Sequence, residues 1–384
     1  MANQTIKKIL WLNWKDIYHP DAGGAEKIQH EICRRLVQNG YEVTLLTSIY
    51  PDAAPSGKID GYQVLRMGNA KSTHTFLARS YFSKHLKNQF DLIVEEVNTA
   101  PYLIKSVSGN EKVVIYYNQL AREIWFHLLK FPLNLIGFVF LEPIATWIQA
   151  LLQRRNNLTM LAISESTKQD IARFGFKKDL IKIFSMGIDN QPLANLTDSA
   201  SKETDFTVLF HSSLRAMKQP MEVFKAFNLV HKTIPEAKLW ISGGGDQTEL
   251  KQFAQENNFD EKVIFFGRTS DSQKLELMQK ATVLCSTSIK EGWGLIVTEA
   301  NSMGTPAIVY DADGLRDSAA AGGNWVVPKN NSEALAQKLI ELNSIFKNQT
   351  DEYETWRQQV WQKSKLVNYD QCYNDFVKYA LEGK

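Results

Sequence analysis

Short apolar runs alternate with longer amphipathic stretches over the first 190 residues. Five of these runs have the length of buried strands and are bounded by turn residues: residues 9–13, 41–47, 91–95, 112–117 and 159–163. After the first run, a Pro/Gly-rich loop leads into a helical pattern that places Ile28, Ile32 and Leu36 on one face and ends at Asn39-Gly40, a C-cap signal. A strand, a helix and a second strand in this order are typical of βαβ units with a parallel sheet.

The same alternation resumes at Thr207. Strand-like runs occupy residues 207–210, 238–242, 262–266, 282–285 and 307–310, and a helical pattern covers residues 220–232. The polar segment 190–205 separates the two series and has the composition of a linker. We therefore expect two Rossmann-like, doubly wound α/β domains that face each other across a cleft. Their predicted extents are residues 1–190 and 191–368, with a final helix in 369–384 joining the first domain.

Residues 124–152 form the most apolar segment of the chain. Lys130, Pro132 and Glu142 interrupt it, so no unbroken apolar stretch reaches the ~20 residues that a membrane span requires. Two interpretations stay open. The segment is a buried helical hairpin of the first domain, or it is a surface that makes peripheral contact with a membrane or a lipid-like substrate through residues 124–155.

Composition narrows the class of protein. The chain has 384 residues, 44% hydrophobic and 22% charged, which excludes a disordered or fibrous protein. Its net charge of +2 is too balanced for a protein that coats nucleic acid, so we expect no nucleic-acid partner. Residues 1–190 nevertheless carry 23 basic and 17 acidic side chains, which favours contact with phosphates or an anionic surface. Three widely spaced cysteines and the lack of a signal-peptide pattern predict a cytoplasmic protein, at most peripheral at the inner face of the membrane.

The strongest local signal is residues 291–299 (EGWGLIVTE), which follow a predicted strand and a short polar loop. Gly292 and Gly294 allow a ligand to approach the backbone closely, and a helix beginning near Leu295 points its free N–H groups into the same space. A diphosphate suits such a site. The glutamates at the two ends of the segment can accept hydrogen bonds from sugar hydroxyls, although two glutamates eight residues apart are by themselves a weak signal.

Residues 291–318 (EGWGLIVTEANSMGTPAIVYDADGLRDS) resemble the Glu-x7-Glu segment of the retaining glycosyltransferases of family 4. Further segments resemble this family in the same order along the chain: residues 13–26 (NWKDIYHPDAGGAE), 162–170 (AISESTKQD), 186–189 (MGID), 239–246 (LWISGGGD) and 265–268 (FFGR). The resemblance implies a GT-B fold, with an acceptor-binding N-terminal domain and a nucleotide-sugar-binding C-terminal domain.

The resemblance also assigns roles to individual residues. Those implied in catalysis are Glu291, Lys218, Arg215 and Asn118. Those implied in donor binding are Gly23, Gly24, Ser213, Gly243, Arg268, Gly292, Trp293, Gly294, Leu295 and Glu299. In this assignment Glu291 orients the transferred sugar, Glu299 binds the nucleoside ribose, and Lys218 neutralises the diphosphate as it leaves.

Two positions depart from the family pattern. Ser213 stands where the family has an arginine that accompanies Lys218, and the nearest arginine is Arg215. Either Arg215 reaches the phosphates from a shifted backbone, or one cation is missing. Asn118 stands where many members have a histidine, and an asparagine can bind a hydroxyl but cannot shuttle a proton at neutral pH.

The predicted activity is transfer of a hexose, with retention, from a nucleoside-diphosphate sugar such as UDP- or GDP-hexose. The expected acceptor is a hydroxyl group, with a lipid-linked or cell-surface glycan as the candidate molecule. No Asp-x-Asp metal motif stands where a nucleotide-sugar diphosphate would need one, so we expect no metal and no cofactor. Because the full Gly-x-Gly-x-x-Gly is lacking after Gly243, a dehydrogenase is disfavoured. The alternatives are a degenerate, non-catalytic nucleotide-sugar-binding or partner subunit on the same fold and, with less support, an epimerase.

Overall fold

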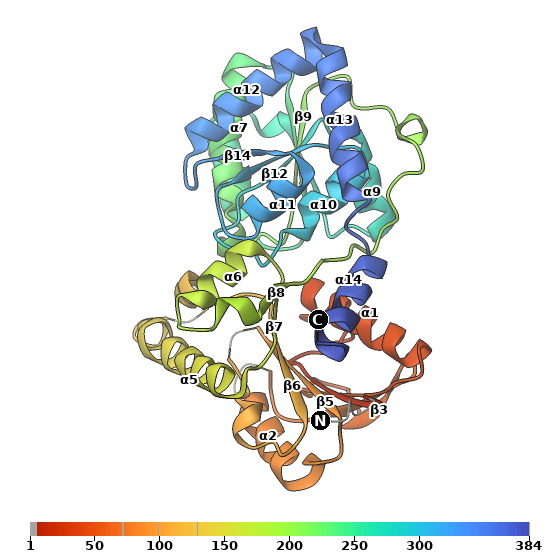
Figure 1. Ribbon diagram of the computed structural model, residues 1–384. Helices are drawn as coiled ribbons and strands as arrows, with labels where there is room; N and C mark the ends of the chain where they lie inside the picture. Colours follow the sequence, from red (N-terminus) through yellow and green to blue (C-terminus); the bar gives the residue numbers. More distant parts are fainter. Residues whose placement is uncertain (1–5, 71–72, 99, 129, 384) are drawn as a thin grey trace. The chain divides into compact units, whose positions relative to one another are not determined.

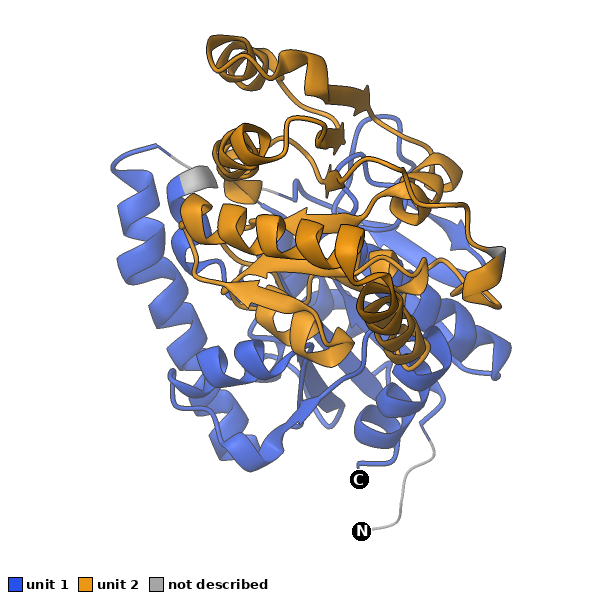
Figure 2. Cartoon of the chain, turned by 90° about the horizontal axis from the view of Figure 1, so that it is seen from above, with its two compact units in different colours: residues 1–187, 368–384 blue, residues 188–367 orange. Residues whose placement is uncertain are grey.

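The apolar runs predicted from the sequence form strands of two sheets. The structure is a computed structural model that describes residues 6–70, 73–98, 100–128 and 130–383. The chain divides into two units, which Figure 2 shows in different colours. Unit 1 comprises residues 1–187 and 368–384, and unit 2 comprises residues 188–367.

The sheet of unit 1 has the strand order β3-β4-β2-β1-β5-β6-β7-β8 (Figure 1). In chain order, its strands are β1 (Lys8–Leu12), β2 (Glu42–Thr47), β3 (Ser56–Ile59), β4 (Tyr62–Arg66), β5 (Leu92–Val97), β6 (Lys112–Tyr117), β7 (Met160–Ala162) and β8 (Ile181–Ile183). All neighbouring strands are parallel except the pair β3 and β4. The sheet is wound outward in both directions from the adjacent strands β1 and β5.

The helices of unit 1 bury the faces that their sequence periodicity predicts. They include α1 (Gly24–Gln38), α2 (His74–Tyr81), α5 (Glu142–Asn156), α6 (Glu165–Ala172) and α14 (Tyr369–Phe376). Ile28, Ile32 and Leu36 of α1 are fully buried. The C-terminal helix α14 belongs to this unit, where Phe376 stacks on Trp11 of β1 with ring centroids 5.3 Å apart.

The sheet of unit 2 is parallel throughout, with the strand order β11-β10-β9-β12-β13-β14. Its strands are β9 (Thr207–His211), β10 (Lys238–Ser242), β11 (Val263–Gly267), β12 (Val283–Ser286), β13 (Ala307–Tyr310) and β14 (Trp325–Val327). Its helices are α7 (Pro220–Thr233), α8 (Thr248–Glu256), α9 (Asp271–Lys280), α10 (Leu295–Ser302), α11 (Leu315–Gly322), α12 (Ser332–Asn348) and α13 (Thr350–Ser364).

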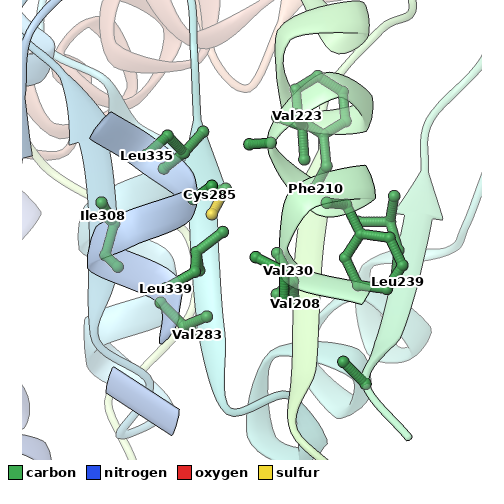
Figure 3. Close-up of a cluster of buried hydrophobic side chains, with 14 of the residues drawn as sticks. Val208, Phe210, Val223, Val230, Leu239, Val283, Cys285, Ile308, Leu335 and Leu339 are labelled. Atoms are coloured by element: carbon green, nitrogen blue, oxygen red, sulfur yellow. The ribbon is translucent and has the colours of Figure 1, made fainter. Parts of the chain in front are cut away.

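Both faces of the unit 2 sheet are covered by helices. On one face, Val208 and Phe210 of β9 pack beneath α7 and α12 (Figure 3). On the other face, Leu209 packs with residues of α9, α10 and α11. The alternation along β9 is the period of two expected of a strand that is buried on both sides.

The predicted architecture of two α/β units with parallel sheets is confirmed. The predicted strand boundaries lie within one or two residues of the observed ones. Strands β3, β4, β8 and β14 were not predicted from the sequence. Three of them have only three or four residues, and β3 is largely exposed, so their apolar patterns are too short or too polar to be distinguished from loops.

Candidate functional site

The carboxyl ends of β9 and β12 are the place where the winding of unit 2 reverses direction. Ligands of open α/β sheets bind at such a point, beyond the carboxyl ends of the strands. Here the loop after β9 and the loop after β12 are bonded to each other. Thr287 Oγ1 donates to the backbone oxygens of Lys218 (3.1 Å) and Gln219 (3.0 Å), and Ile289 N donates to Met217 O (2.9 Å).

Lys218 and Glu291, one from each loop, form an ion pair. Lys218 Nζ donates to Glu291 Oε1, and the side chains are only 16% and 21% exposed. The backbone of Glu291 is fixed in turn, because its N–H donates to Asp313 O at 2.9 Å. The neighbouring Lys290 Nζ lies 3.2 Å from Asp313 Oδ2. The predicted cation and the predicted sugar-orienting carboxylate therefore meet in one place.

Glycines shape the turn that follows Glu291. Gly294 is the N-cap of α10 and has a φ of +86°, a left-handed conformation that favours glycine. Gly314 has a φ of +77°, and a Cβ atom there would lie 2.4 Å from Glu291 O and 2.7 Å from Gly292 C. The backbone at Gly314 can therefore pack this closely against Glu291 and Gly292 only because residue 314 has no side chain. The first-turn N–H groups of α10 open onto this turn, as in anion-binding helix N-termini.

Trp293 and Leu295 lie at the start of the same helix. Trp293 Nε1 donates to Thr298 Oγ1 at 3.1 Å, which holds the indole against the first turn of α10. Leu295 is the first residue of α10 and is half-buried. Both predicted donor-binding residues are thus beside the glycine turn.

Glu299 lies on α10 and is paired with a residue that the sequence did not predict. Lys274 Nζ on α9 is 3.0 Å from Glu299 Oε1 and 3.5 Å from Asp271 Oδ1, and Lys274 is buried. Burial and the charge of Lys274 lower the pKa of His211 to about 4, so its ring is neutral at pH 7. His211 Nδ1 is 2.9 Å from Ser242 Oγ. A lysine on an amphipathic helix is ordinarily a surface residue, so the sequence pattern gave no signal for Lys274.

Ser213 and Arg215 are in direct contact. Arg215 Nε donates to Ser213 Oγ at 2.9 Å, and Lys218 N donates to Arg215 O at 2.8 Å. The guanidinium therefore lies beside the position at which the family arginine is expected. Arg215 remains exposed.

Gly243 and Arg268 lie at the ends of β10 and β11. Gly243 has a φ of +136°, and a Cβ atom would fall 1.8 Å from Ser212 O, so tight backbone packing accounts for this glycine. The exposed Arg268 side chain lies against Gly244, where a Cβ atom would be 2.7 Å from Arg268 Nε. The donor-binding role of both residues remains a prediction.

Three predicted site residues, Gly23, Gly24 and Asn118, belong to unit 1. Gly23 is the N-cap of α1, and its N–H donates to Glu26 Oε2 at 2.6 Å. Gly24 is the first residue of that helix. Lys15 Nζ lies 3.4 Å from Glu26 Oε1. The buried Glu26 carboxylate therefore binds two residues of the loop that precedes α1, Lys15 and Gly23.

Asn118 follows β6 and is part of a buried polar cluster at the carboxyl ends of β1, β5 and β6. Asn118 Nδ2 donates to Glu96 Oε1 (2.7 Å) and Asn98 Oδ1 (2.8 Å), and Asn98 Nδ2 donates to Asn13 Oδ1 (3.0 Å). Trp11 Nε1 donates to Glu96 Oε2 at 2.7 Å. Asn13 Nδ2 and Asn118 Oδ1 are buried. Among the residues that the structure describes, these two atoms of the cluster have no hydrogen-bond partner.

Glu96 is the central residue of this cluster, and the sequence prediction omitted it. Burial raises the pKa of Glu96 to about 8, so the carboxyl is mostly protonated at pH 7. The preceding Glu95 is also buried, which raises its pKa to about 7. Two glutamates inside an apolar strand are the signal that could have identified the cluster, because such residues are rarely buried without a partner.

Across the residues that the structure describes, no group of three or more His, Cys, Asp or Glu side chains could hold a metal ion. Cations beside the glycine turn of unit 2 include the side chains of Lys218 and Lys290, together with Arg215 at the exposed edge of the loop after β9.

Comparison with known proteins identifies the class and then the family. Solved GT-B structures share the fold: the chain superposes on Anabaena HepE, a structure in complex with UDP and glucose, with a TM-score of 0.70 at 14% identity, over 98% of this chain and all of that one. Residues 22–191 match the family model described as Glycosyltransferase Family 4, and residues 194–359 match Glycosyl transferases group 1. The chain belongs to the family 4 type of GT-B glycosyltransferases, which confirms the resemblance seen in the sequence.

Two curated relatives match over shorter stretches. Poly(glycerol-phosphate) alpha-glucosyltransferase of Bacillus subtilis (strain 168) is 41% identical over 134 residues, which is 34% of this chain and 20% of that protein. Phosphatidyl-myo-inositol mannosyltransferase of Mycobacterium leprae is 32% identical over 139 residues, 35% of this chain and 37% of that protein. The matched stretches thus span a fifth and about a third of these relatives.

Proposed function

We propose that this glycosyltransferase moves a hexose from a nucleoside-diphosphate sugar to an acceptor hydroxyl with retention of anomeric configuration. The observation that carries the proposal is the Lys218–Glu291 ion pair beside the glycine turn at the N-terminus of α10. A cation, a carboxylate and the N–H groups at the start of α10 thus lie together near the carboxyl ends of β9 and β12. Ligands of open α/β sheets bind at such a place.

The diphosphate binds to Lys218, to Arg215 and to the first-turn N–H groups of α10. Glu291 neutralises Lys218 in the ion pair described above. A bound diphosphate competes for the ammonium group, and the Glu291 carboxylate is then released to accept hydrogen bonds from the sugar hydroxyls. Glu299, held by Lys274, accepts hydrogen bonds from the ribose hydroxyls.

The transfer step needs positioning and charge stabilisation more than a side-chain nucleophile. The bond between the anomeric carbon and the β-phosphate oxygen breaks while the acceptor oxygen bonds to the same face of that carbon. The departing phosphate takes the acceptor proton. The diphosphate then gains negative charge, which Lys218, Arg215 and the N-terminus of α10 stabilise without a metal ion.

The names of the relatives support a first choice of substrates. HepE was solved with UDP and glucose, and the Bacillus subtilis relative is named a glucosyltransferase. UDP-glucose is therefore the first donor to test, followed by GDP-mannose. The name of the Mycobacterium leprae relative, phosphatidyl-myo-inositol mannosyltransferase, includes a lipid, which supports a lipid-linked acceptor. On unit 1, we assign sugar-hydroxyl binding to Asn118, which follows β6 and belongs to the polar cluster around Glu96.

The deciding experiment replaces Glu291 and measures binding and transfer separately. Glu291→Gln removes the charge but keeps the size, so UDP should still bind by calorimetry, while nucleotide release in the presence of acceptor falls by about 10²–10³-fold. Glu341→Gln, which changes an exposed carboxylate paired with Lys338 in the same unit, should leave both measurements unchanged. An E291Q rate equal to that of the wild type would contradict the site assignment.

A non-catalytic nucleotide-sugar-binding subunit is the second candidate function. Ser213 and Asn118 favour it, because both replace residues that the family uses. The contact of Arg215 with Ser213 argues against it, because a guanidinium lies next to the position of the family arginine. Tight binding of a nucleotide sugar with no nucleotide release over a prolonged incubation, with a panel of glycan acceptors, would establish this alternative.

A further inference from the structure

The helix formed by residues 133–156 has its polar and apolar faces reversed with respect to a helix of a water-soluble domain. It consists of α4 (Leu133–Ile136), a π-helical turn (Gly137–Leu141) and α5 (Glu142–Asn156), which is labelled in Figure 1 and belongs to unit 1. Its buried side chains in α5 are mostly polar and recur at helical spacing: Glu142, Thr146, Gln149, Ala150 and Gln153. A surface helix normally buries its apolar stripe.

The buried polar stripe is bonded to the rest of unit 1. Glu142 accepts hydrogen bonds from the backbone of Ala121 (2.6 Å) and Arg122 (2.8 Å) and from Trp125 Nε1 (2.9 Å). These bonds fix the rotation of the helix about its axis at one end of α5.

Gln149 and Gln153 continue the stripe. Gln149 accepts from Tyr117 OH at 2.5 Å and donates to Glu95 Oε1 at 2.8 Å, so it is bonded to two strands of the sheet. Gln153 Oε1 accepts from Lys177 N at 3.1 Å. The apolar residues of the helix therefore point outward because its polar residues are held inward.

The outward face is large and apolar. Its exposed hydrophobic side chains, with that of the preceding Phe131, are 37–79% exposed: Phe131, Leu133, Leu135, Ile136, Val139, Phe140, Leu141, Ile144, Trp147, Ile148 and Leu151. The interpretation of this segment as a buried helical hairpin of the first domain is therefore wrong. A contiguous apolar surface of this kind has a partner or an apolar medium as its usual environment.

Positive charge borders the apolar face. Lys130 precedes the helix, and Arg154 and Arg155 form its last turn; all three are exposed. Glu142 is the acidic residue of the helix, and it is buried and bonded inward. An apolar face with an aromatic residue and flanking basic side chains matches the interface of a bilayer that contains anionic lipid.

We propose that the apolar face of helix 133–156 lies in the interfacial region of an anionic membrane and brings unit 1 to that surface. By length and composition alone this helix could cross a membrane. Crossing, however, would remove the hydrogen bonds of Glu142, Gln149 and Gln153 to unit 1, whereas contact along the surface keeps them. The helix therefore lies parallel to the membrane, with Trp147 and Phe140 among the inserted side chains.

Vesicle binding tests this inference without donor or acceptor, so its outcome is separate from that of the proposed transfer. The full-length protein is sedimented with vesicles of phosphatidylcholine alone or with one third phosphatidylglycerol. We expect at least tenfold stronger partition onto the anionic vesicles. Ile144→Glu combined with Trp147→Glu should lower that partition at least tenfold, and Arg154→Glu combined with Arg155→Glu should reduce it toward the value for neutral vesicles.

Two matched controls change the same kinds of residue in unit 2. Leu366→Glu replaces an apolar side chain that is 73% exposed, and Lys232→Glu replaces an exposed lysine; both should bind vesicles as the wild type does. An unchanged circular dichroism spectrum verifies that each variant is folded. Failure of the wild type to bind, or undiminished binding by I144E/W147E, would overturn the proposal. A wild-type dimer without lipid that I144E/W147E makes monomeric, with no vesicle binding, would assign the face to a second copy of the chain.

Discussion

Lys218 and Glu291 lie 73 residues apart in the chain and are joined in one ion pair beside the glycine turn. At the scale of the residue, most of the charges in the two candidate regions are held by a second group. Lys274 holds Glu299, and Asp313 holds Lys290. Glu96 in unit 1 is different, because burial keeps its carboxyl neutral instead of pairing it with a cation.

Glu96→Gln should change the pH dependence of stability. Burial raises the pKa of folded Glu96 to about 8, above its ordinary value of 4.5. Below pH 4.5 the carboxyl is protonated in both the folded and the unfolded state, so the variant and the wild type should be similar. As pH rises from 4.5 to 8, only the unfolded wild type releases its proton, and the wild type loses at most about 1.4 kcal/mol of unfolding free energy per pH unit.

Urea unfolding at pH 4.5, 6 and 8.5 checks this expectation. Glu96→Gln should gain stability over the wild type as pH rises, because glutamine remains a neutral donor and acceptor. Glu42→Gln is the control and should show no such gain. Glu42 is exposed, and its Oε2 lies 3.6 Å from Lys8 Nζ. A variant that is less stable by the same amount at every pH would indicate that Glu96 is ionised in the folded protein.

At the scale of the element, the turn between β12 and α10 depends on a glycine that lies outside the turn itself. Gly314 precedes α11 and makes room for the backbone of Glu291 and Gly292. Gly292 and Gly294 were predicted from the sequence and Gly314 was not, because Gly314 lies more than twenty residues farther along the chain than the backbone it approaches.

Gly314→Ala should displace the Glu291 backbone. A Cβ atom 2.4 Å from Glu291 O cannot be accommodated without a shift of main chain, and the φ of +77° adds strain. We expect a loss of roughly 1–3 kcal/mol in unfolding free energy and a weaker affinity for UDP in calorimetry.

Gly40→Ala is the control that separates the main-chain clash at position 314 from the strain of a positive φ. Gly40 has a φ of +86°, and a Cβ atom there would have no neighbouring atom within 4 Å, so alanine meets the backbone strain alone. It should cost about 1 kcal/mol and leave UDP binding unchanged. Equal UDP affinity in G314A and the wild type would show that the turn tolerates the shift.

At the scale of the whole molecule, the last 17 residues complete unit 1, although unit 2 precedes them in the chain. Phe376 is fully buried and stacks on Trp11, and Asp375 Oδ2 accepts a hydrogen bond from Ser185 N at 3.1 Å. Unit 1 is therefore finished only after unit 2 has been synthesised.

Phe376→Ala should destabilise unit 1 selectively. Removal of a fully buried aromatic side chain costs about 3–5 kcal/mol. Hydrogen exchange should show lower protection in β1 and β5 of unit 1 and unchanged protection in β9 and β12 of unit 2. Leu366→Ala, ten residues earlier and 73% exposed, should change neither unit. Equal loss of protection in both units would mean that they unfold as one.

The sequence by itself determined the strands with clear apolar runs, the helix face of Ile28, Ile32 and Leu36, and the family, because local periodicity and short motifs are properties of neighbouring residues. It also singled out Lys218, Glu291 and Asn118, whose roles stay predictions. The tertiary structure alone decided which groups meet: Lys274 with Glu299, Arg215 with Ser213, and the buried cluster around Glu96.

Helix 133–156 gives the clearest case. Its composition allowed either a buried hairpin or a membrane surface, because composition does not say which face of a helix is turned inward. The hydrogen bonds of Glu142, Gln149 and Gln153 to unit 1 fixed that rotation and left the apolar face outside. Contacts between residues distant in the chain therefore decided the orientation that local sequence left open.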